Sequence, residues 1–192
     1  MAKRGYTRDT IRGGASDWDV SRPFSSALRT LGSLVGHPGR FFEVLPKVPD
    51  VRAPGLFLAF SGVVSAVVWS LFGGIYAALA GLFSPLIASL IIALLSHLGT
   101  WGGRYDFVVT WRTVVYPVGF FAPLAAVPII RWAAVFYAGV VLLSFGLATV
   151  REVSVARAVV VSAAITAIVL AFMWVVSGRF APVFGSWFLV LG

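Results

Sequence analysis

Long apolar runs separated by short polar breaks fill the chain from about residue 55 onward. Five of these runs are 18 to 25 residues long and carry no charged side chain. A helix rises about 1.5 Å per residue, so each run is long enough to cross a hydrocarbon core about 30 Å thick. The five predicted spans are Leu56–Ala80, Phe83–Trp101, Thr113–Ile130, Trp132–Val150 and Ala158–Ser177. We therefore predict an all-α integral membrane protein with five transmembrane helices.

An amphipathic segment precedes the first span. Between Phe24 and Val35 apolar residues recur at helical spacing, while serine, threonine and arginine occupy the opposite side. The sequence Gly36-His37-Pro38-Gly39 interrupts this helix, and Pro38 is suited to open a second short helix that runs to Leu45. We expect residues 23–54 to form an amphipathic segment whose helix lies in the headgroup plane of the cytoplasmic leaflet.

The two ends complete the predicted organisation. Residues 1–22 mix charges and glycines without apolar periodicity, which predicts a disordered cytoplasmic tail. Residues 55–178 form the predicted five-span bundle, and residues 179–192 form an interfacial tail on the opposite face of the membrane. Because the first long apolar run begins only near Leu56, we expect no cleaved signal peptide, and the first span acts as the signal.

Composition supports the membrane assignment. Of the 192 residues, 59% are hydrophobic and only 11% are charged, with a mean hydropathy of +0.95. A soluble domain carries roughly 25% charged residues, so a water-soluble fold is excluded. The chain has no cysteine, which excludes disulfides, thiolate metal sites and cysteine nucleophiles.

The distribution of charge predicts the orientation. Nine of the 15 Lys and Arg residues lie in the first 52 positions, and none lies between Ala53 and Gly103. With the amino terminus in the cytoplasm, 13 basic residues lie inside and two, Arg131 and Arg179, lie outside. This distribution follows the positive-inside rule and places the carboxyl terminus on the opposite face. A prokaryotic inner or plasma membrane is the expected location.

The third predicted span is unusual because Pro117, Pro123 and Pro128 interrupt it. Its carbonyls need partners from neighbouring helices, so we expect it to be kinked or unwound at the centre of the bundle. Small residues that allow close helix packing recur at a spacing of four. They are Gly73, Ala77 and Gly81, and Ala163, Ala167 and Ala171.

Candidate contact residues gather at the connections that this topology places in the cytoplasm. The first connection carries Arg104, Asp106 and Arg112, and the second carries Arg151, Glu152 and Arg157. We expect Asp106 to pair with Arg104, Arg112 or Arg157. His97, near the end of the second span, is interpreted as an interfacial histidine that reaches headgroups or water rather than as a metal ligand.

Several classes of function find no support in the sequence. There is no phosphate-binding loop, no paired carboxylate at membrane depth and no zinc-protease helix, so an enzyme, a cofactor and a resident metal are not expected. No charge falls in the middle of a predicted span, which argues against a proton-coupled pump. The tail mixes acidic and basic residues, so we expect binding to anionic lipid headgroups rather than to nucleic acid.

The order of these pieces, from His37 to Ala171, resembles the Yip (Ypt-interacting protein) domain family in its bacterial and archaeal form. The residues that carry the resemblance are Pro38 with Phe41 and Phe42, His97 followed by Gly102, Gly103 and Phe107, Tyr116 with Pro123, and Gly146, Leu147, Ser154, Arg157 and Ala158. The resemblance implies a five-span membrane protein that works by association with partners. The Asp-Leu-Tyr-Gly-Pro-like motif of eukaryotic members is missing from the tail, so a GTPase partner is not implied.

These observations predict a non-enzymatic adaptor or accessory subunit that binds protein partners or organises membrane lipid at its cytoplasmic face. The candidate contact residues are Arg40, Phe41, Phe42, His97, Arg104, Asp106, Arg112, Tyr116, Arg151, Glu152 and Arg157. Two alternatives stay open: a small permease or lipid transporter that uses the proline-broken third span, and a subunit of a larger respiratory or photosynthetic complex. Membrane lipids and other proteins are the expected partners, and self-association is left open.

Overall fold

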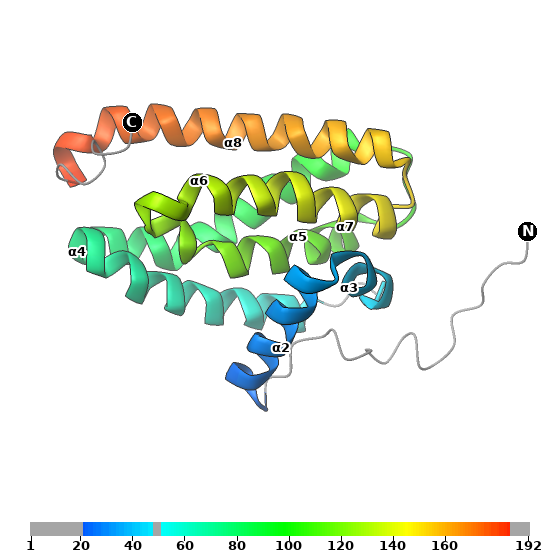
Figure 1. Ribbon diagram of the computed structural model, residues 1–192, viewed down its shortest axis with the longest axis horizontal. Coiled ribbons are helices and arrows are strands. Elements are labelled where there is room, and N and C mark those ends of the chain that lie inside the picture. The colour runs from blue at the N-terminus through cyan, green and yellow to red at the C-terminus, as the bar shows by residue number, and fades with distance from the viewer. Residues whose placement is uncertain (1–20, 48–50, 185–192) are drawn as a thin grey trace, which may run out of the picture.

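The computed structural model describes residues 21–47 and 51–184, and this part of the chain is helical without strands. Long helices lie side by side as a bundle, and two short helices pack near one end of it (Figure 1). The elements in chain order are α2 Pro23–Gly36, α3 Pro38–Val44, α4 Arg52–Gly99, α5 Phe107–Phe121, the 3₁₀ helix η1 Leu124–Ala126, α6 Pro128–Phe136, the π-helix η2 Tyr137–Leu142, α7 Leu143–Val150 and α8 Val155–Phe184. The predicted all-α class is confirmed.

Helix α4 is a hairpin of two antiparallel arms rather than one rod. The chain turns at Gly73 and Gly74, where Gly74 has φ 63° and ψ −150°, a conformation that only glycine adopts readily. Beyond the turn the arms touch backbone to backbone: a Cβ on Gly81 would lie 2.8 Å from the Ser65 carbonyl oxygen. The predicted spans Leu56–Ala80 and Phe83–Trp101 placed the connection at residues 81–82, and this position was therefore wrong. Gly81 lies inside the second arm, where the absence of a side chain lets the arms approach.

Helix α5 forms the centre of the bundle. Every residue from Val109 to Pro117 is buried, which confirms the predicted central position of this segment. The predicted bounds Thr113–Ile130 were wrong, because the helix begins at Phe107 and ends at Phe121. The chain passes through η1 before α6 begins at Pro128, and this break confirms the predicted effect of the prolines.

Helices α5 and α6 both begin earlier than predicted, and this changes the position of two arginines. Arg112, predicted in a connection, lies within α5 and is buried. Arg131, predicted between two spans, lies in the first turn of α6 and is also buried. Both arginines therefore lie inside helices rather than in the connections where they were predicted.

The remaining elements agree with the predictions apart from their ends. Helices α2 and α3 match the two predicted short helices, with a break at His37. The rod from α6 through η2 to α7 begins at Pro128 rather than Trp132, and α8 begins at Val155 and runs to Phe184. Most of the predicted tails 1–22 and 179–192 lies outside the described residues. Residues 179–184, predicted in the second tail, belong to α8 instead.

The exterior of the bundle is apolar, unlike that of a soluble protein. Leu71, Ile75 and Tyr76 are exposed on α4, whereas serines and threonines are buried between the helices beside the apolar core. The buried hydroxyl residues include Ser61, Ser65, Ser89, Ser96, Thr110, Thr113, Ser162 and Thr166. An apolar exterior around an interior that contains small hydroxyl residues is typical of membrane helices. Ala163, Ala167 and Ala171 are exposed on α8, so their predicted packing inside the bundle was wrong.

Three helical stretches in the described part of the chain are long and apolar enough to cross a membrane. They are Arg52–Gly99, Ile130–Val150 and Val155–Val175, and α5 is a shorter apolar helix.

Candidate functional site

Arg151 ties together the two connections at the end of the bundle that is predicted to face the cytoplasm. Its guanidinium is only 1% exposed and donates to the carbonyl oxygens of Thr100 (3.1 Å), Arg104 (2.9 Å) and Tyr105. Its Nε also donates to the Thr100 hydroxyl at 3.2 Å. Because these bonds use the fork of the side chain, Arg151 holds the loop 100–106 against the end of α7.

The charge of Arg151 persists at neutral pH. Burial lowers the pKa of Arg151, while the Asp106 carboxylate raises this pKa and Arg157 lowers it. An arginine stays protonated across the physiological range even when its pKa is lowered. The loop is thus held by a permanent cation that donates to neutral carbonyls.

An exposed charge cluster sits on the loop that Arg151 holds. Arg104 donates to both carboxylate oxygens of Glu152 at 3.2 Å, and Lys47 Nζ lies 3.8 Å from Glu152 Oε1. Lys47 and Arg104 also approach the ring of Tyr105, at 5.6 and 5.2 Å from its centroid. Chain segments from before α4, before α5 and before α8 therefore meet at one polar surface.

Asp106 and Arg157 cap helix ends. The Asp106 carboxylate accepts a hydrogen bond from the Val109 amide at 3.2 Å, which makes it the N-cap of α5. Arg157 donates to the carbonyl oxygens of Gly99 (3.2 Å) and Trp101 (2.9 Å) at the carboxyl end of α4. Both predicted contact residues thus have structural roles of their own.

Three aromatic candidates are buried. Helix α3 inserts Phe41 and Phe42 into the bundle, and the Phe41 ring meets Tyr116 of α5 edge to face at 5.6 Å. The Tyr116 ring also contacts Phe57 of α4 at 5.1 Å. Hence these rings hold α3 on the bundle and are not exposed to a partner, while Arg40 beside them is exposed.

His97 is half-buried next to the beginning of α5. Its Nδ1 lies 3.2 Å from the Thr110 hydroxyl, and its ring packs edge-on against Phe107 at 5.9 Å. These contacts join the second arm of α4 to α5.

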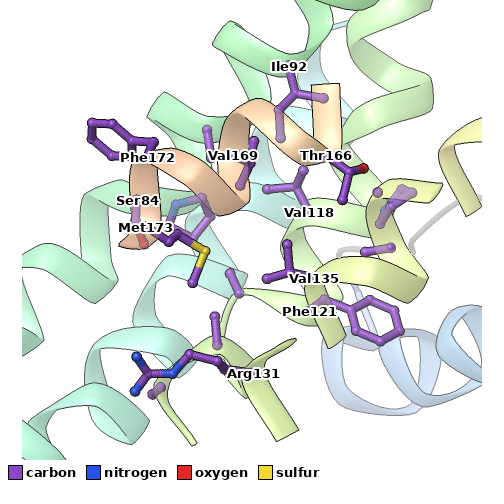
Figure 2. Close-up of a pocket in the computed structure, with 18 of the residues that line it drawn as sticks. Ser84, Ile92, Val118, Phe121, Arg131, Val135, Thr166, Val169, Phe172 and Met173 are labelled. Carbon is purple, nitrogen blue, oxygen red and sulfur yellow. The ribbon is translucent and has the colours of Figure 1, made fainter. Parts of the chain in front are cut away.

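A cavity of about 440 Å³ lies between the helices of the bundle (Figure 2). Its walls come from α4, α5, η1, α6, η2, α7 and α8, and nearly all of the side chains are apolar. Arg131 lies at one end of it, and Ile92 and Thr166 lie toward the other. Sequence reasoning missed this cavity, because the signal is spread over small residues such as Ala77 and Ala88 on separate helices.

Comparisons with protein-family models, with curated proteins and with solved structures found no match.

Proposed function

We propose that this chain is a non-enzymatic integral membrane protein that crosses the bilayer five times and organises membrane lipid at its cytoplasmic face. The two arms of α4, then α5, the rod from α6 to α7, and α8 supply the five crossings. The arms, residues 52–72 and 75–99, reach roughly 32 and 37 Å at about 1.5 Å per residue, against a core of about 30 Å. The shorter α5 is buried among the others from Val109 to Pro117, which shields most of its length from lipid.

The orientation of α2 is the observation that carries the lipid role. This helix packs Ser26, Thr30 and Leu34 inward, yet it leaves Phe24 72% and Leu28 71% exposed. An amphipathic helix with outward aromatic and aliphatic groups is suited to rest in the headgroup region.

Exposed basic residues lie on this helix and on the next two helices of the chain. They are Arg29 of α2, Arg40 of α3 and Arg52 at the beginning of α4. Each basic residue near an anionic surface contributes about 1 kcal/mol of attraction. The combination of apolar and basic groups supports contact with anionic lipid.

A depth measurement on α2 tests this proposal. Because the chain has no cysteine, Leu28→Cys and Arg29→Cys each give a unique site for a nitroxide spin label. In vesicles containing phosphatidylglycerol, we expect the label at position 28 to collide with oxygen dissolved in the lipid. The label at position 29 should collide more with a water-soluble nickel complex.

Two other patterns would contradict the proposal. Equal exposure of both labels to nickel would mean that α2 lies in water. Immobilisation of both labels, with little access to either reagent, would mean that protein covers the helix.

Docking of a protein partner is the second candidate, and the exposed cluster of Lys47, Arg104 and Glu152 favours it. Arg151 fixes this cluster in place, so a partner would meet a surface that is already ordered. The resemblance to the Yip family fits this candidate. A partner should be recovered from native membranes in mild detergent by the wild-type chain and lost by Glu152→Lys. Recovery of only the chain itself would count against it.

A further inference from the structure

We propose that the cavity beside Arg131 is a binding site for an anionic membrane amphiphile, whose acyl chain fills the cavity and whose acidic headgroup binds the guanidinium. This inference relies on the membrane location proposed above, since lipid must reach the site, but not on the role of α2.

The size of the cavity suits an acyl chain. Its volume of about 440 Å³ is within the range of roughly 300–1,000 Å³ that is usual for ligand pockets. Along α4 its wall extends from Ala77 to Ile92, which is about 22 Å at 1.5 Å per residue. One leaflet is about half of a 30-Å core, so a chain of lipid length can be accommodated.

Three polar side chains in the wall donate their hydrogen bonds to backbone carbonyls of the protein. The Thr166 hydroxyl donates to the Ser162 carbonyl at 2.8 Å, and Trp69 Nε1 donates to the Ala122 carbonyl at 3.2 Å. The Ser84 hydroxyl donates to the Gly81 carbonyl at 3.5 Å. The rest of the wall therefore recognises hydrocarbon and little else.

Arg131 supplies the recognition of charge. It is the only charged residue among the described residues that line the cavity, and it is just 7% exposed. A guanidinium has five N–H donors, so it can bind a phosphate or carboxylate in addition to its contacts within the protein. It lies in the first turn of α6, where the helix dipole also favours a negative charge.

The site has a route of access from the bilayer. Phe72 and Phe172 both line the cavity, and Phe172 is 67% exposed on the outer surface of α8. Figure 2 shows Phe172 and Met173 on α8 at the side of the cavity, which Ser84 of α4 also lines. A lipid chain could thus enter sideways between α4 and α8, without passing through water.

Oleate and oleyl alcohol test the proposal on the wild-type protein, because they share a chain and differ in charge. Binding is measured on the purified full chain in a neutral detergent, so the result does not depend on membrane orientation or on α2. We expect oleate to bind at least about tenfold more tightly. Lysophosphatidylglycerol should displace oleate, whereas lysophosphatidylcholine should not. Displacement by fatty acids alone would identify the carboxylate rather than the phosphate as the natural headgroup.

Three variants locate the site. Arg131→Gln should remove the tenfold preference while leaving the binding of oleyl alcohol unchanged. Ala88→Phe places a ring in the cavity wall and should weaken the binding of both ligands several-fold. Arg157→Gln, at the other end of the bundle, is the matched control and should bind as wild type.

Equal binding of oleate and oleyl alcohol by the wild-type chain would overturn the proposal. So would wild-type binding by Ala88→Phe, since the ligand would then lie elsewhere. Neither measurement uses Arg131→Gln, so the proposal can be overturned even if that variant does not fold.

Discussion

At the scale of single residues, Arg151 shows how much structure one buried side chain can hold. Replacing it with glutamine removes the guanidinium that donates to the carbonyls of Thr100, Arg104 and Tyr105. Hydrogen bonds to charged groups contribute about 1.5–3 kcal/mol each, so we expect Arg151→Gln to destabilise the protein by about 3 kcal/mol or more. Thermal unfolding in detergent measures this loss.

Arg157→Gln is the control for this prediction. Arg157 also donates to two carbonyls, but it is exposed, and water can replace its bonds. We expect a loss below about 1 kcal/mol. Equal melting temperatures for the two variants would show that the burial of Arg151 adds nothing.

The sequence located the charges of this region but not their roles. Arg104, Glu152 and Arg157 could be assigned to one end of the bundle because hydropathy defines which connections share a side. That Asp106 caps α5 was also readable: an aspartate before an apolar run is a usual N-cap, and it would have moved the helix start to Phe107. Burial of Arg112 follows from that earlier start, and hydropathy alone does not reveal it.

At the scale of elements, the turn in α4 depends on one backbone conformation. Gly74 has φ 63° and ψ −150°, and a side chain there costs about 1–3 kcal/mol. We expect Gly74→Ala to lower the melting temperature, although no atom stands in the way of its methyl group.

We expect Gly32→Ala, in contrast, to raise the melting temperature. Gly32 lies within α2, also with open space around it, and alanine is up to about 1 kcal/mol more favourable than glycine inside a helix. If the melting temperature falls by a similar amount in both variants, the backbone conformation of Gly74 is not the cause.

Hydropathy predicted the number of helical segments better than the places where they turn. The run from Leu56 to Trp101 is apolar throughout, so no charged residue marks its turn. Hydropathy alone therefore does not distinguish a turn at Gly81 from a turn at Gly73 and Gly74. The Gly-Gly pair was the stronger turn signal. In contrast, Pro38, Pro123 and Pro128 act through the local backbone, and the breaks at these positions were predictable.

At the scale of the whole molecule, the bundle has a polar end and an apolar end. Loop 100–106 and the segment after α7 meet at the end held by Arg151, while the turn of α4 lies at the opposite end (Figure 1). Successive helices run in alternating directions (Figure 1), so the five crossings proposed above would place the beginning of α4 and the carboxyl end of α8 on opposite faces of the membrane. Positive charge should keep the Arg151 end in the cytoplasm.

Two single cysteines test this orientation, because the native chain has none. Ser154 is exposed beside α8 at the Arg151 end, and Leu124 is exposed in η1 at the other end. In intact cells, a membrane-impermeant maleimide should label Leu124→Cys and should label Ser154→Cys only after lysis. The reverse pattern would invert the topology and place the Arg131 site in the cytoplasmic leaflet. Labelling of both from the outside would mean that the rod between them does not cross the membrane, because α6, η2 and α7 separate the two positions.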